Sequence, residues 1–398
     1  RLYRLTNTDV KELKSEFRAL SKDIKRLKQI IAKKDVLHQL IITELQQINE
    51  EISTPRKTAI EEEVEDLSVD QKDMIADEQV VIPITREGYI KRVSVRSYES
   101  SSNPITGHKD SDDMLFHGPA STLDTLLFFT SSGKYGYLPV YKLEEAKWKD
   151  LGSHIGNYLK MDANERIVQA YILDTFDPQT EVIMASRYGM IKRTRLSELE
   201  VSRMNKTMVC MKVGSMDELI SVNLSYHEED EVIVCSRNGY AAMYPVSQIS
   251  EMACKTKGVK ALNLSKQDTI ADVKVIPKEI DQLLVVTEKM MMKRIKVSEI
   301  FHGNRPVKGS LISKLVKSNP NYVYKVYPTT AESVFTISGT ERIELTAKEV
   351  PFKNAGATYS SPYGKMEQFA IHEPLYKIET GAWKVDQPEA FVQETLFI

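Results

Sequence analysis

Residues 182–199 read VIMASRYGMIKRTRLSEL, an apolar run, a turn at Gly189 and a second run that carries charges. Apolar runs of this length on both sides of a glycine turn predict two antiparallel strands. Ser186 stands three residues before the glycine, where its hydroxyl can bond the turn backbone while the glycine adopts a positive φ. The stretch therefore predicts one β-hairpin.

The same pattern recurs along most of the chain. The copies are VVIPITREGYIKRVSVRSY at 80–98, LLFFTSSGKYGYLPVYKL at 126–143, VIVCSRNGYAAMYPVSQI at 232–249, LLVVTEKMMMKRIKVSEI at 283–300 and the weaker VFTISGTERIELTAKEV at 334–350. The turn position falls at Gly88, Gly133, Gly189, Gly239, Met290 and Glu341. This period of roughly 50 residues is typical of propellers built from four-stranded blades.

Between the hairpins lies a looser pattern of a basic cluster, a strand and an acidic turn. Its clearest copy runs from Lys255 to Asp268, and Arg203 to Asp217 and Arg305 to Lys317 are fainter copies. Each repeat then supplies about four strands, which make one blade. We expect a mixed, mainly β chain in which six blades, or five, close into a ring without a long free edge.

Two helices are predicted ahead of the ring. Apolar residues recur at spacings of three and four over 8–33, at Val10, Leu13, Phe17, Leu20, Ile24, Leu27 and Ile31. This spacing predicts a coiled-coil seam, and helix packing in a globular core is the alternative. Asp35 is the expected N-cap of a second helix that Pro55 ends. We expect helices in 1–58, an acidic linker in 59–78, the β ring in 79–375 and a tail in 376–398.

The composition excludes other classes of protein. The three cysteines form no CxxC pair, the seven histidines are scattered, and the apolar runs are strand-sized. These observations argue against a zinc site, a disulfide framework and a membrane-spanning protein, and they favour the reducing cytoplasm. Nucleotide-binding and hydrolase motifs are absent, so we expect no catalytic or metal site. The first residue is Arg1, which suggests part of a longer chain.

Charge is distributed unevenly, and cations recur at fixed places. The net charge is −2, whereas residues 181–317 hold 22 Lys/Arg and 16 Asp/Glu. Lys-Arg pairs occupy equivalent positions in the first, third and fifth hairpins, and simple tolerance of cations on exposed strands is the alternative explanation. Because strand side chains alternate, one member of each pair can face a common surface. We predict a track that binds DNA phosphates with salt-dependent affinity, strongest between Arg187 and Lys317. Its predicted contacts are Lys91, Arg92, Arg187, Lys192, Arg193, Arg195, Arg203, Arg237, Lys257, Lys260, Lys293, Arg294, Lys296, Arg305 and Lys308.

Several stretches together resemble one protein family. They are RLYRLT at 1–6 with the heptad helix, PRKTAI at 55–60, IADE at 75–78 and GYIKR at 88–92. The chain resembles the C-terminal portion of the A subunits of bacterial type IIA topoisomerases, except for about the last twenty residues. The resemblance implies the end of a coiled-coil and C-gate region, followed by a β-pinwheel, a propeller whose blades exchange strands.

The resemblance also distinguishes two branches of the family. The gyrase branch carries a QRRGGKG box in the first blade, where this chain reads SSSNPITGHK at 100–109, and the KWKDLG at 147–152 is similar to topoisomerase IV A subunits. The topoisomerase IV branch is therefore favoured. It implies a DNA-binding part that is not catalytic alone, because the nucleophilic tyrosine belongs upstream of Arg1.

The family resemblance further implies partners and surroundings. The expected partners are double-stranded DNA, the B subunit of topoisomerase IV and a second copy of the A subunit in an A2B2 enzyme. That enzyme performs ATP-dependent double-strand passage, decatenation and relaxation during chromosome segregation. Mg²⁺ and ATP are expected in the B subunit, with no cofactor in this chain, and the location is the cytoplasm, on the nucleoid. The alternatives are a gyrase A C-terminal domain that wraps DNA for negative supercoiling, and a propeller scaffold for protein partners.

Overall fold

The computed structural model describes residues 2–54, 74–101, 106–162, 164–202, 204–227, 229–315, 318–338, 342–361, 364 and 369–378. The chain divides into two compact units, residues 1–69 and 70–398. Most of the predicted linker and tail lies outside the described residues, as does Pro55.

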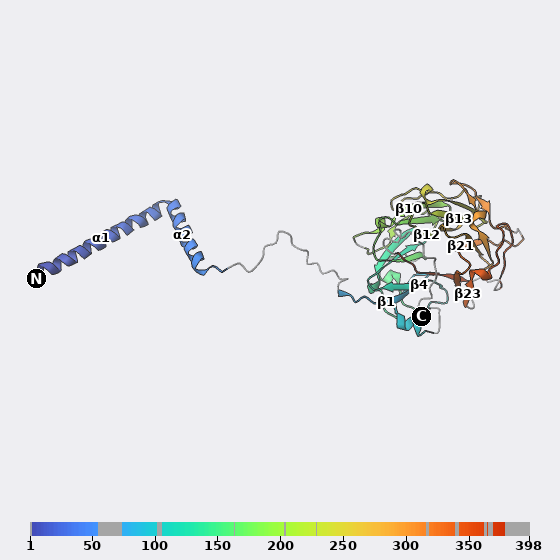
Figure 1. Ribbon diagram of the computed structural model, residues 1–398, viewed down its shortest axis with the longest axis horizontal. Coiled ribbons are helices and arrows are strands. Elements are labelled where there is room, and N and C mark those ends of the chain that lie inside the picture. Colours follow the sequence, from blue (N-terminus) through green and yellow to red (C-terminus); the bar gives the residue numbers. More distant parts are fainter. Residues whose placement is uncertain are drawn as a thin grey trace. The chain divides into compact units, whose positions relative to one another are not determined.

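The first unit contains two helices, α1 (Leu2–Ala32) and α2 (Lys34–Ile52) (Figure 1). The prediction that Asp35 caps the second helix is wrong. Lys33 is the N-cap residue and its side chain makes no capping bond, so Asp35 lies in the first turn, where its charge favours the positive helix end. The seam residues from Val10 to Ile31 are 44–84% exposed, so they do not pack into a core within the described part of this chain.

The second unit contains six hairpins that follow one another around a ring, from cyan through yellow to red in Figure 1. The hairpins, numbered here as blades 1 to 6, are β1 (Gln79–Thr85) with β2 (Tyr89–Ile90) and β3 (Val93–Ser94); β5 (Thr125–Thr130) with β6 (Lys134–Pro139); β9 (Glu181–Ser186) with β10 (Met190–Arg195); β13 (Glu231–Ser236) with β14 (Tyr240–Pro245); β17 (Gln282–Thr287) with β18 (Met292–Lys296); and β22 (Val334–Ser338) with β23 (Arg342–Thr346). The predicted hairpin repeat is confirmed.

Each hairpin gains one strand on its inner side. These inner strands are β4 (Met114–Ser121), β8 (Ile167–Leu173), β12 (Leu219–Ser225), β16 (Ile270–Ile276), β21 (Val323–Thr329) and β24 (Ala370–Pro374). Each pairs antiparallel with the first strand of its own hairpin, and β12, β16 and β21 lie beside one another. The inner strands therefore surround the axis of the ring.

Most blades gain a further short strand on the outer side. These strands are β7 (Ser153–His154), β11 (Met208–Val209), β15 (Val259–Lys260), β19 (Phe301–His302) and β20 (Ser310–Leu311). Each follows one hairpin in the chain but pairs with the second strand of the preceding blade, as β15 follows β14 and pairs with β10. The blades therefore exchange strands, and each exchanged stretch is called here a returning segment. Because no described hairpin follows blade 6, β23 pairs only with β22 among the described strands.

The first strands of blades 1 to 5 are buried on both faces. Leu126 and Phe128 pack toward blade 1, whereas the alternate residues Leu127 and Phe129 pack toward blade 3. Strand side chains alternate in direction, so one strand serves two core layers. This explains why the first strands are continuous apolar runs rather than alternating ones.

The turns have the predicted geometry. The four turn glycines have φ between 73° and 96°, and Met290 takes the same left-handed region with φ 55°. Ser186 Oγ accepts a bond from Met190 N at 3.3 Å, and Asp217 accepts one from Tyr188 N at 3.0 Å. Asp268 likewise accepts a bond from Asn238 N at 3.0 Å, so acidic residues after two of the basic clusters fasten the hairpin turns of blades 3 and 4.

The second strands end earlier than predicted. Blade 1 forms a short helix, α3 (Val95–Glu99), and the other blades form single 3₁₀ turns. In blade 1 the Ser94 side chain accepts a bond from Ser97 N and caps this helix. A last strand, β25 (Lys377–Ile378), pairs with β8, so the ring extends to Ile378. Among the described helices, none is both long and apolar enough to cross a membrane.

Candidate nucleic-acid interface

The lysines of the predicted Lys-Arg pairs lie inside the protein. Lys192 on β10 is 0% exposed, and its Nζ donates to Cys210 O at 2.9 Å, Ala253 O at 2.8 Å and Thr256 Oγ1 at 3.1 Å. Cys210 belongs to one returning segment, and Ala253 and Thr256 belong to the next. One buried ammonium group therefore joins a second strand to two exchanged segments.

Lys91 and Lys293 have the same role in blades 1 and 5. Lys91 is 1% exposed and bonds carbonyls of the returning segment at Lys147, Trp148 and Asp150. Lys293 is 0% exposed and bonds the carbonyls of Ala355 and Ala357 at 2.5 and 2.9 Å. Buried ammonium groups need such acceptors, because burial without hydrogen bonds is costly.

Burial also changes the titration of these lysines. It lowers the pKa of Lys91 and of Lys293 to about 8 each, and it lowers the pKa of Lys192 as well. Nearby negative charge opposes this shift only in part, Asp150 for Lys91 and Glu299 for Lys293. The structure thus places the ammonium groups of these three predicted DNA contacts inside the protein, where they hold returning segments and do not reach the surface.

The arginine of each pair faces the other way and bonds the segment that follows the hairpin of the next blade. Arg193 donates to both carboxylate oxygens of Glu181 at 2.8–3.0 Å and to Ile249 O. Arg294 bonds Gln282 and Val350 O in the same manner, and Arg92 pairs with Glu145 at 3.5 Å. All three are half-buried, and their bonds join one blade to the segment that follows the next hairpin.

Blades 2 and 4 have no Lys-Arg pair at the equivalent positions, which are Gly136-Tyr137 and Ala242-Met243. In blade 2, Gly136 takes the lysine position, with Phe128 and Leu159 packed against it. Tyr137 takes the arginine position, and its hydroxyl bonds both N and O of Val201. The pairs are thus one of several ways to hold a returning segment in place.

Three further predicted contacts are paired with glutamates. Arg187 binds Glu218, Arg195 binds Glu251 at 2.8 Å, and Arg237 binds both oxygens of Glu288 at 2.8–3.0 Å. The Arg237 guanidinium also lies 3.9 Å from the centre of the Tyr322 ring. Their charges are therefore largely balanced within the protein.

The returning segments carry a second, different set of cations. Four stretches, called here the rim belt, are residues 153–160, 205–213, 252–264 and 303–314. They hold nine Lys or Arg and no Asp or Glu. The nine are Lys160, Lys206, Lys212, Lys255, Lys257, Lys260, Arg305, Lys308 and Lys314. All are exposed except Arg305, which is half-buried.

Backbone hydrogen bonds join these stretches sideways into one band. Thr207 N donates to Lys160 O at 3.1 Å, Lys212 N to Thr256 O at 2.9 Å, and Asn263 N to Val307 O at 2.9 Å. Since β11, β15 and β20 lie on the outer side of their sheets, the band follows the rim of the ring. The fold therefore places the acid-free, cationic segments of successive blades side by side in one band along the rim.

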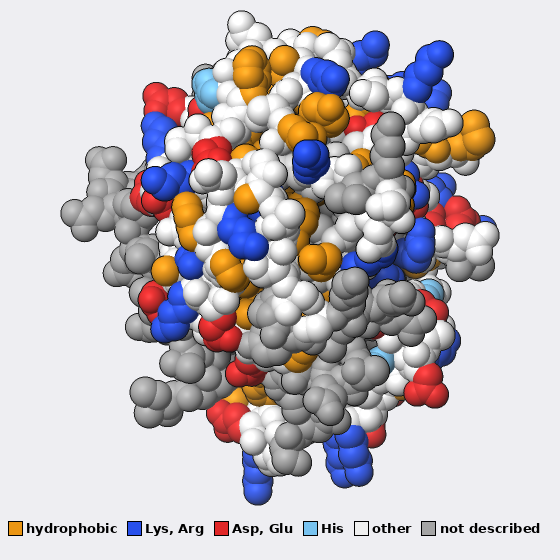
Figure 2. Space-filling view, turned by 90° about the vertical axis from the view of Figure 1, so that its right-hand side faces the viewer, with side chains coloured by type: hydrophobic (Ala, Val, Ile, Leu, Met, Phe, Trp, Pro, Cys, Tyr) orange, Lys and Arg blue, Asp and Glu red, His pale blue; other side chains and the backbone are white. Residues whose placement is uncertain are grey.

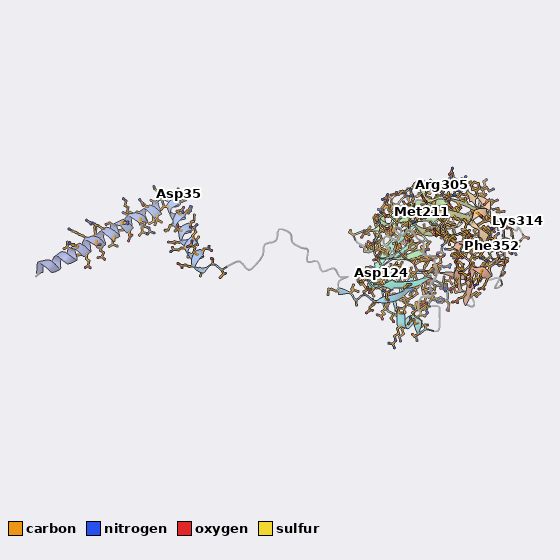
Figure 3. All side chains as sticks on the ribbon, viewed as in Figure 1. Asp35, Asp124, Met211, Arg305, Lys314 and Phe352 are labelled. Carbon is orange, nitrogen blue, oxygen red and sulfur yellow. The ribbon has the colours of Figure 1, made fainter. Side chains whose placement is uncertain are left out.

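The belt cations are available to a ligand. None of the nine forms an ion pair within the part of the chain that the structure describes. Lys308 Nζ lies 4.7 Å from the centre of the Tyr240 ring, and Arg305 bonds the carbonyls of Gln248 and Lys260, which leaves its charge unbalanced. Figure 3 shows Arg305 and Lys314 at the outer edge of the β unit. Figure 2 shows one side of the β unit, on which Lys and Arg, Asp and Glu, and apolar side chains are interspersed.

The predicted contacts therefore separate into groups. Lys257, Lys260, Arg305 and Lys308 belong to the rim belt, Lys296 is exposed at the end of β18 outside it, and Arg203 lies outside the described residues. Five belt lysines were not predicted: Lys160, Lys206, Lys212, Lys255 and Lys314. Counting acids and bases separately in each segment between hairpins would have identified them. Among the described residues, no group of His, Cys, Asp or Glu has the arrangement of a metal site.

Comparison with known proteins agrees with this architecture. The family "DNA gyrase C-terminal domain, beta-propeller" matches residues 81–103, 124–174, 180–223 and 230–277. The A subunit of DNA topoisomerase 4 from Bacillus subtilis (strain 168) is 32% identical over 352 residues, which cover 88% of this chain and 43% of that protein. Its counterpart from Staphylococcus epidermidis is 35% identical over 323 residues, 81% of this chain and 40% of that protein. The chain thus spans less than half of these relatives.

Two solved structures have the same ring. The C-terminal domain of DNA topoisomerase IV superposes with a TM-score of 0.66 at 27% identity, over 75% of this chain and 94% of that one. A DNA gyrase A C-terminal domain superposes with a TM-score of 0.58 at 19% identity, over 74% of this chain and all of that one, which shows the fold alone. With its strand-exchanging blades and these relatives, the chain belongs to the family of gyrase and topoisomerase IV A subunits, and its ring is the C-terminal β-propeller of that family.

Proposed function

We propose that this chain is the C-terminal part of the A subunit of topoisomerase IV and that its rim belt binds duplex DNA. The observation that carries the proposal is the band of nine cations without an acid, continuous across the returning segments. Flexible, exposed lysines suit phosphate groups, which present one charge per about 1.7 Å of duplex. Such contacts position DNA without reading its sequence.

The belt covers only part of the ring, which favours bending over full wrapping. Residues 144–152 hold two lysines but three acids, and residues 351–361 hold one cation, Lys353. Lys353 is half-buried and its Nζ bonds Thr358 O at 3.0 Å. DNA that follows the belt therefore meets few free cations on either side of it, and the cost of bending is offset by contacts along one arc.

In the complete enzyme, the bent DNA is the segment to be transported. The relatives are topoisomerase 4 A subunits, so we assign this chain to an A2B2 enzyme that also contains the B subunit, with the two A subunits joined through the helical region. In this proposal the B subunit supplies ATP hydrolysis and Mg²⁺, and this part of the A subunit is not catalytic alone. Decatenation, relaxation and chromosome segregation in the cytoplasm, on the nucleoid, follow from this assignment.

The test is DNA binding by the 398-residue chain at several salt concentrations. A triple variant, Lys255→Gln, Lys257→Gln and Lys260→Gln, is compared with Lys278→Gln, an exposed lysine that pairs with Glu229 outside the belt. Wild type should bind duplex DNA less tightly as salt rises. The triple variant should lower the slope of log affinity against log salt by about 2–3, at about 0.9 per phosphate contact. Equal slopes in both variants would refute the proposal.

Two alternatives make different predictions. A gyrase A subunit, reconstituted with a gyrase B subunit, would introduce negative supercoils, whereas the proposed enzyme relaxes and decatenates. A protein-binding scaffold would be indifferent to DNA at every salt concentration. The acid-free belt favours DNA, because an apolar patch rather than nine free cations is typical of a protein-binding surface.

A further inference from the structure

The six contacts between neighbouring blades are not alike. Five of them contain a shared cluster of buried hydrophobic side chains, from blades 1 and 2 through to blades 5 and 6. Among the described residues, no such cluster spans blades 6 and 1. Instead, Val81, Val93 and Met114 of blade 1 pack against Trp148 of a returning segment. This contact is therefore the seam of the ring.

The seam is closed by residues 370–378, called here the closing segment. It begins as the inner strand of blade 6, pairs in parallel with β4 at Glu373 and Pro374, and then pairs with β8 at Lys377 and Ile378. Each of these two parallel pairings joins only two residue pairs. The exchanged strands between other blades are equally short, as β15 pairs with β10 over two residue pairs, so the seam differs from those contacts in lacking a shared hydrophobic cluster.

Two apolar side chains anchor the closing segment on neighbouring blades. Leu375 is buried in the cluster between blades 1 and 2, and Ile378 is buried in the cluster between blades 2 and 3. Leu375 approaches Gly118 of β4 so closely that an added Cβ there would lie 2.6 Å from Leu375 O. Gly118 is therefore required for the segment to dock.

Ion pairs attach the same segment to the far side of the ring. Glu373 Oε2 lies 3.5 Å from Lys274 Nζ on β16, and Oε1 lies 3.4 Å from Lys325 Nζ on β21. The Tyr327 hydroxyl lies 3.3 Å from the same Oε1. At the other end of the segment, Lys377 Nζ lies 2.9 Å from Asp124, in blade 2. Nine residues thus contact blades 1, 2, 4, 5 and 6.

We propose that the closing segment is a releasable fastener: when it leaves β4 and β8, the ring opens between blades 6 and 1. Each of the other five contacts contains a shared hydrophobic cluster, so opening at the seam separates no such cluster and removes only Leu375 and Ile378 from the clusters in which they are buried. The docked segment also fixes the curvature of the rim belt, a step that rests on the proposed function. An open ring then binds DNA with the same cations but bends it less.

The test uses hydrogen exchange of the whole chain without DNA. Gly118→Ala blocks docking sterically and Glu373→Gln removes the central acid. Gly356→Ala, whose Cβ would meet nothing within 4 Å, and Glu229→Gln, in an exposed ion pair, are the matched controls. In the two seam variants, amides of β24, β25, β4 and β8 should exchange at least about ten times faster, whereas the hairpins of blades 3 and 4 keep their wild-type rates.

The outcomes separate the two parts of the proposal. Unchanged exchange in Gly118→Ala, or faster exchange throughout all blades, would overturn the proposal that the closing segment holds the ring closed at the seam. A short duplex labelled with a dye at each end then reports bending by energy transfer, and seam variants should show less transfer at an unchanged salt slope. Equal transfer would overturn the effect on curvature. Absence of DNA binding in wild type would refute the proposed function and leave the exchange result standing.

Discussion

Lys192 and Lys257 lie on neighbouring segments of the same blade, yet the fold gives their charges different surroundings. The Lys192 ammonium is enclosed by two carbonyls and a hydroxyl, whereas the Lys257 side chain extends into solvent two residues before β15. The first holds the exchanged segments together and the second lies on their outer surface. The same residue type thus serves the stability of the ring in one region and its surface charge in the other.

A cation that recurs in several blades therefore marks an equivalent position in the repeat, and its recurrence does not show that the side chain is exposed to solvent. Each position recurs because every blade is built in the same way. A position that faces the exchanged segment needs a donor for its carbonyls, and lysine supplies up to three. Variants at the two kinds of position should therefore differ in which property they change, stability or DNA binding.

The largest effect is expected from removing a buried lysine. Lys192→Met leaves the carbonyls of Cys210 and Ala253 without this donor, so the free energy of unfolding should fall by about 2–4 kcal/mol. Lys257→Met should change it by less than about 0.5 kcal/mol. Urea denaturation of both variants measures the difference, and equal stabilities would contradict the assignment of Lys192.

The second prediction concerns the buried acid at the seam. Burial alone would raise the pKa of Glu373, but ion pairs with Lys274 and Lys325 outweigh it and lower the pKa to about 2, from about 4.5 when unfolded. A group whose pKa is lower in the folded state stabilises the protein at pH values above its unfolded pKa. This stabilisation is lost as the pH falls toward the folded pKa. The free energy of unfolding should therefore drop by about 3 kcal/mol between pH 4.5 and pH 2 through this group.

The control for this titration is the variant Glu373→Gln, which lacks the group. It should be less stable than wild type at pH 7 and should converge toward wild type at low pH. If both proteins lose stability in parallel between pH 4.5 and pH 2, Glu373 does not carry the effect.

A smaller effect should separate two exposed lysines by their place in the fold. Lys260 lies in the rim belt, and Lys296 is exposed outside it. Lys260→Gln should weaken duplex binding several-fold and lower the salt slope by about 1, because one phosphate contact is lost. The duplex affinity of Lys296→Gln should stay within about twofold of wild type. Fluorescence anisotropy in a salt series measures both variants, and a larger loss of affinity in Lys296→Gln would show that the rim belt is not the DNA-binding surface.

The smallest effect is expected at an exposed arginine that already has a partner. Arg195→Gln breaks the surface ion pair with Glu251, which should change the stability little, because ion pairs between exposed side chains contribute little. Its DNA affinity should stay near that of wild type, since the arginine charge is balanced by the glutamate. A loss as large as that of Lys260→Gln would show that paired arginines also bind DNA.

Much of the fold could be predicted because its signals are local. The turn glycines, the hydroxyl three residues earlier and the two-sided apolar strands each follow from backbone geometry within one hairpin. Met290 replaces a turn glycine and still adopts positive φ, since its side chain is buried in the cluster between blades 5 and 6. The six-bladed architecture then follows from the spacing of these turns.

The exposure of the Lys-Arg pairs could not be predicted because it depends on strand exchange. Lys192 is buried by residues 18 and more than 60 positions away, and no periodicity within β10 reveals them. The seam is likewise invisible in sequence, because Glu373 meets Lys274 and Lys325 only when the ring closes. The belt could have been found, since the absence of acids in each returning segment is a local property.

Lysine modification with and without DNA tests most directly whether the belt lysines bind DNA and the strand lysines are buried. The 398-residue chain is treated with an acetylating reagent, alone and with saturating duplex at low salt, and each lysine is quantified by mass spectrometry. Belt lysines such as Lys257, Lys260 and Lys308 should react in the free protein and be protected by DNA, whereas Lys91, Lys192 and Lys293 should stay unreactive in both. Reactive strand lysines, or belt lysines that DNA leaves unprotected, would contradict the account.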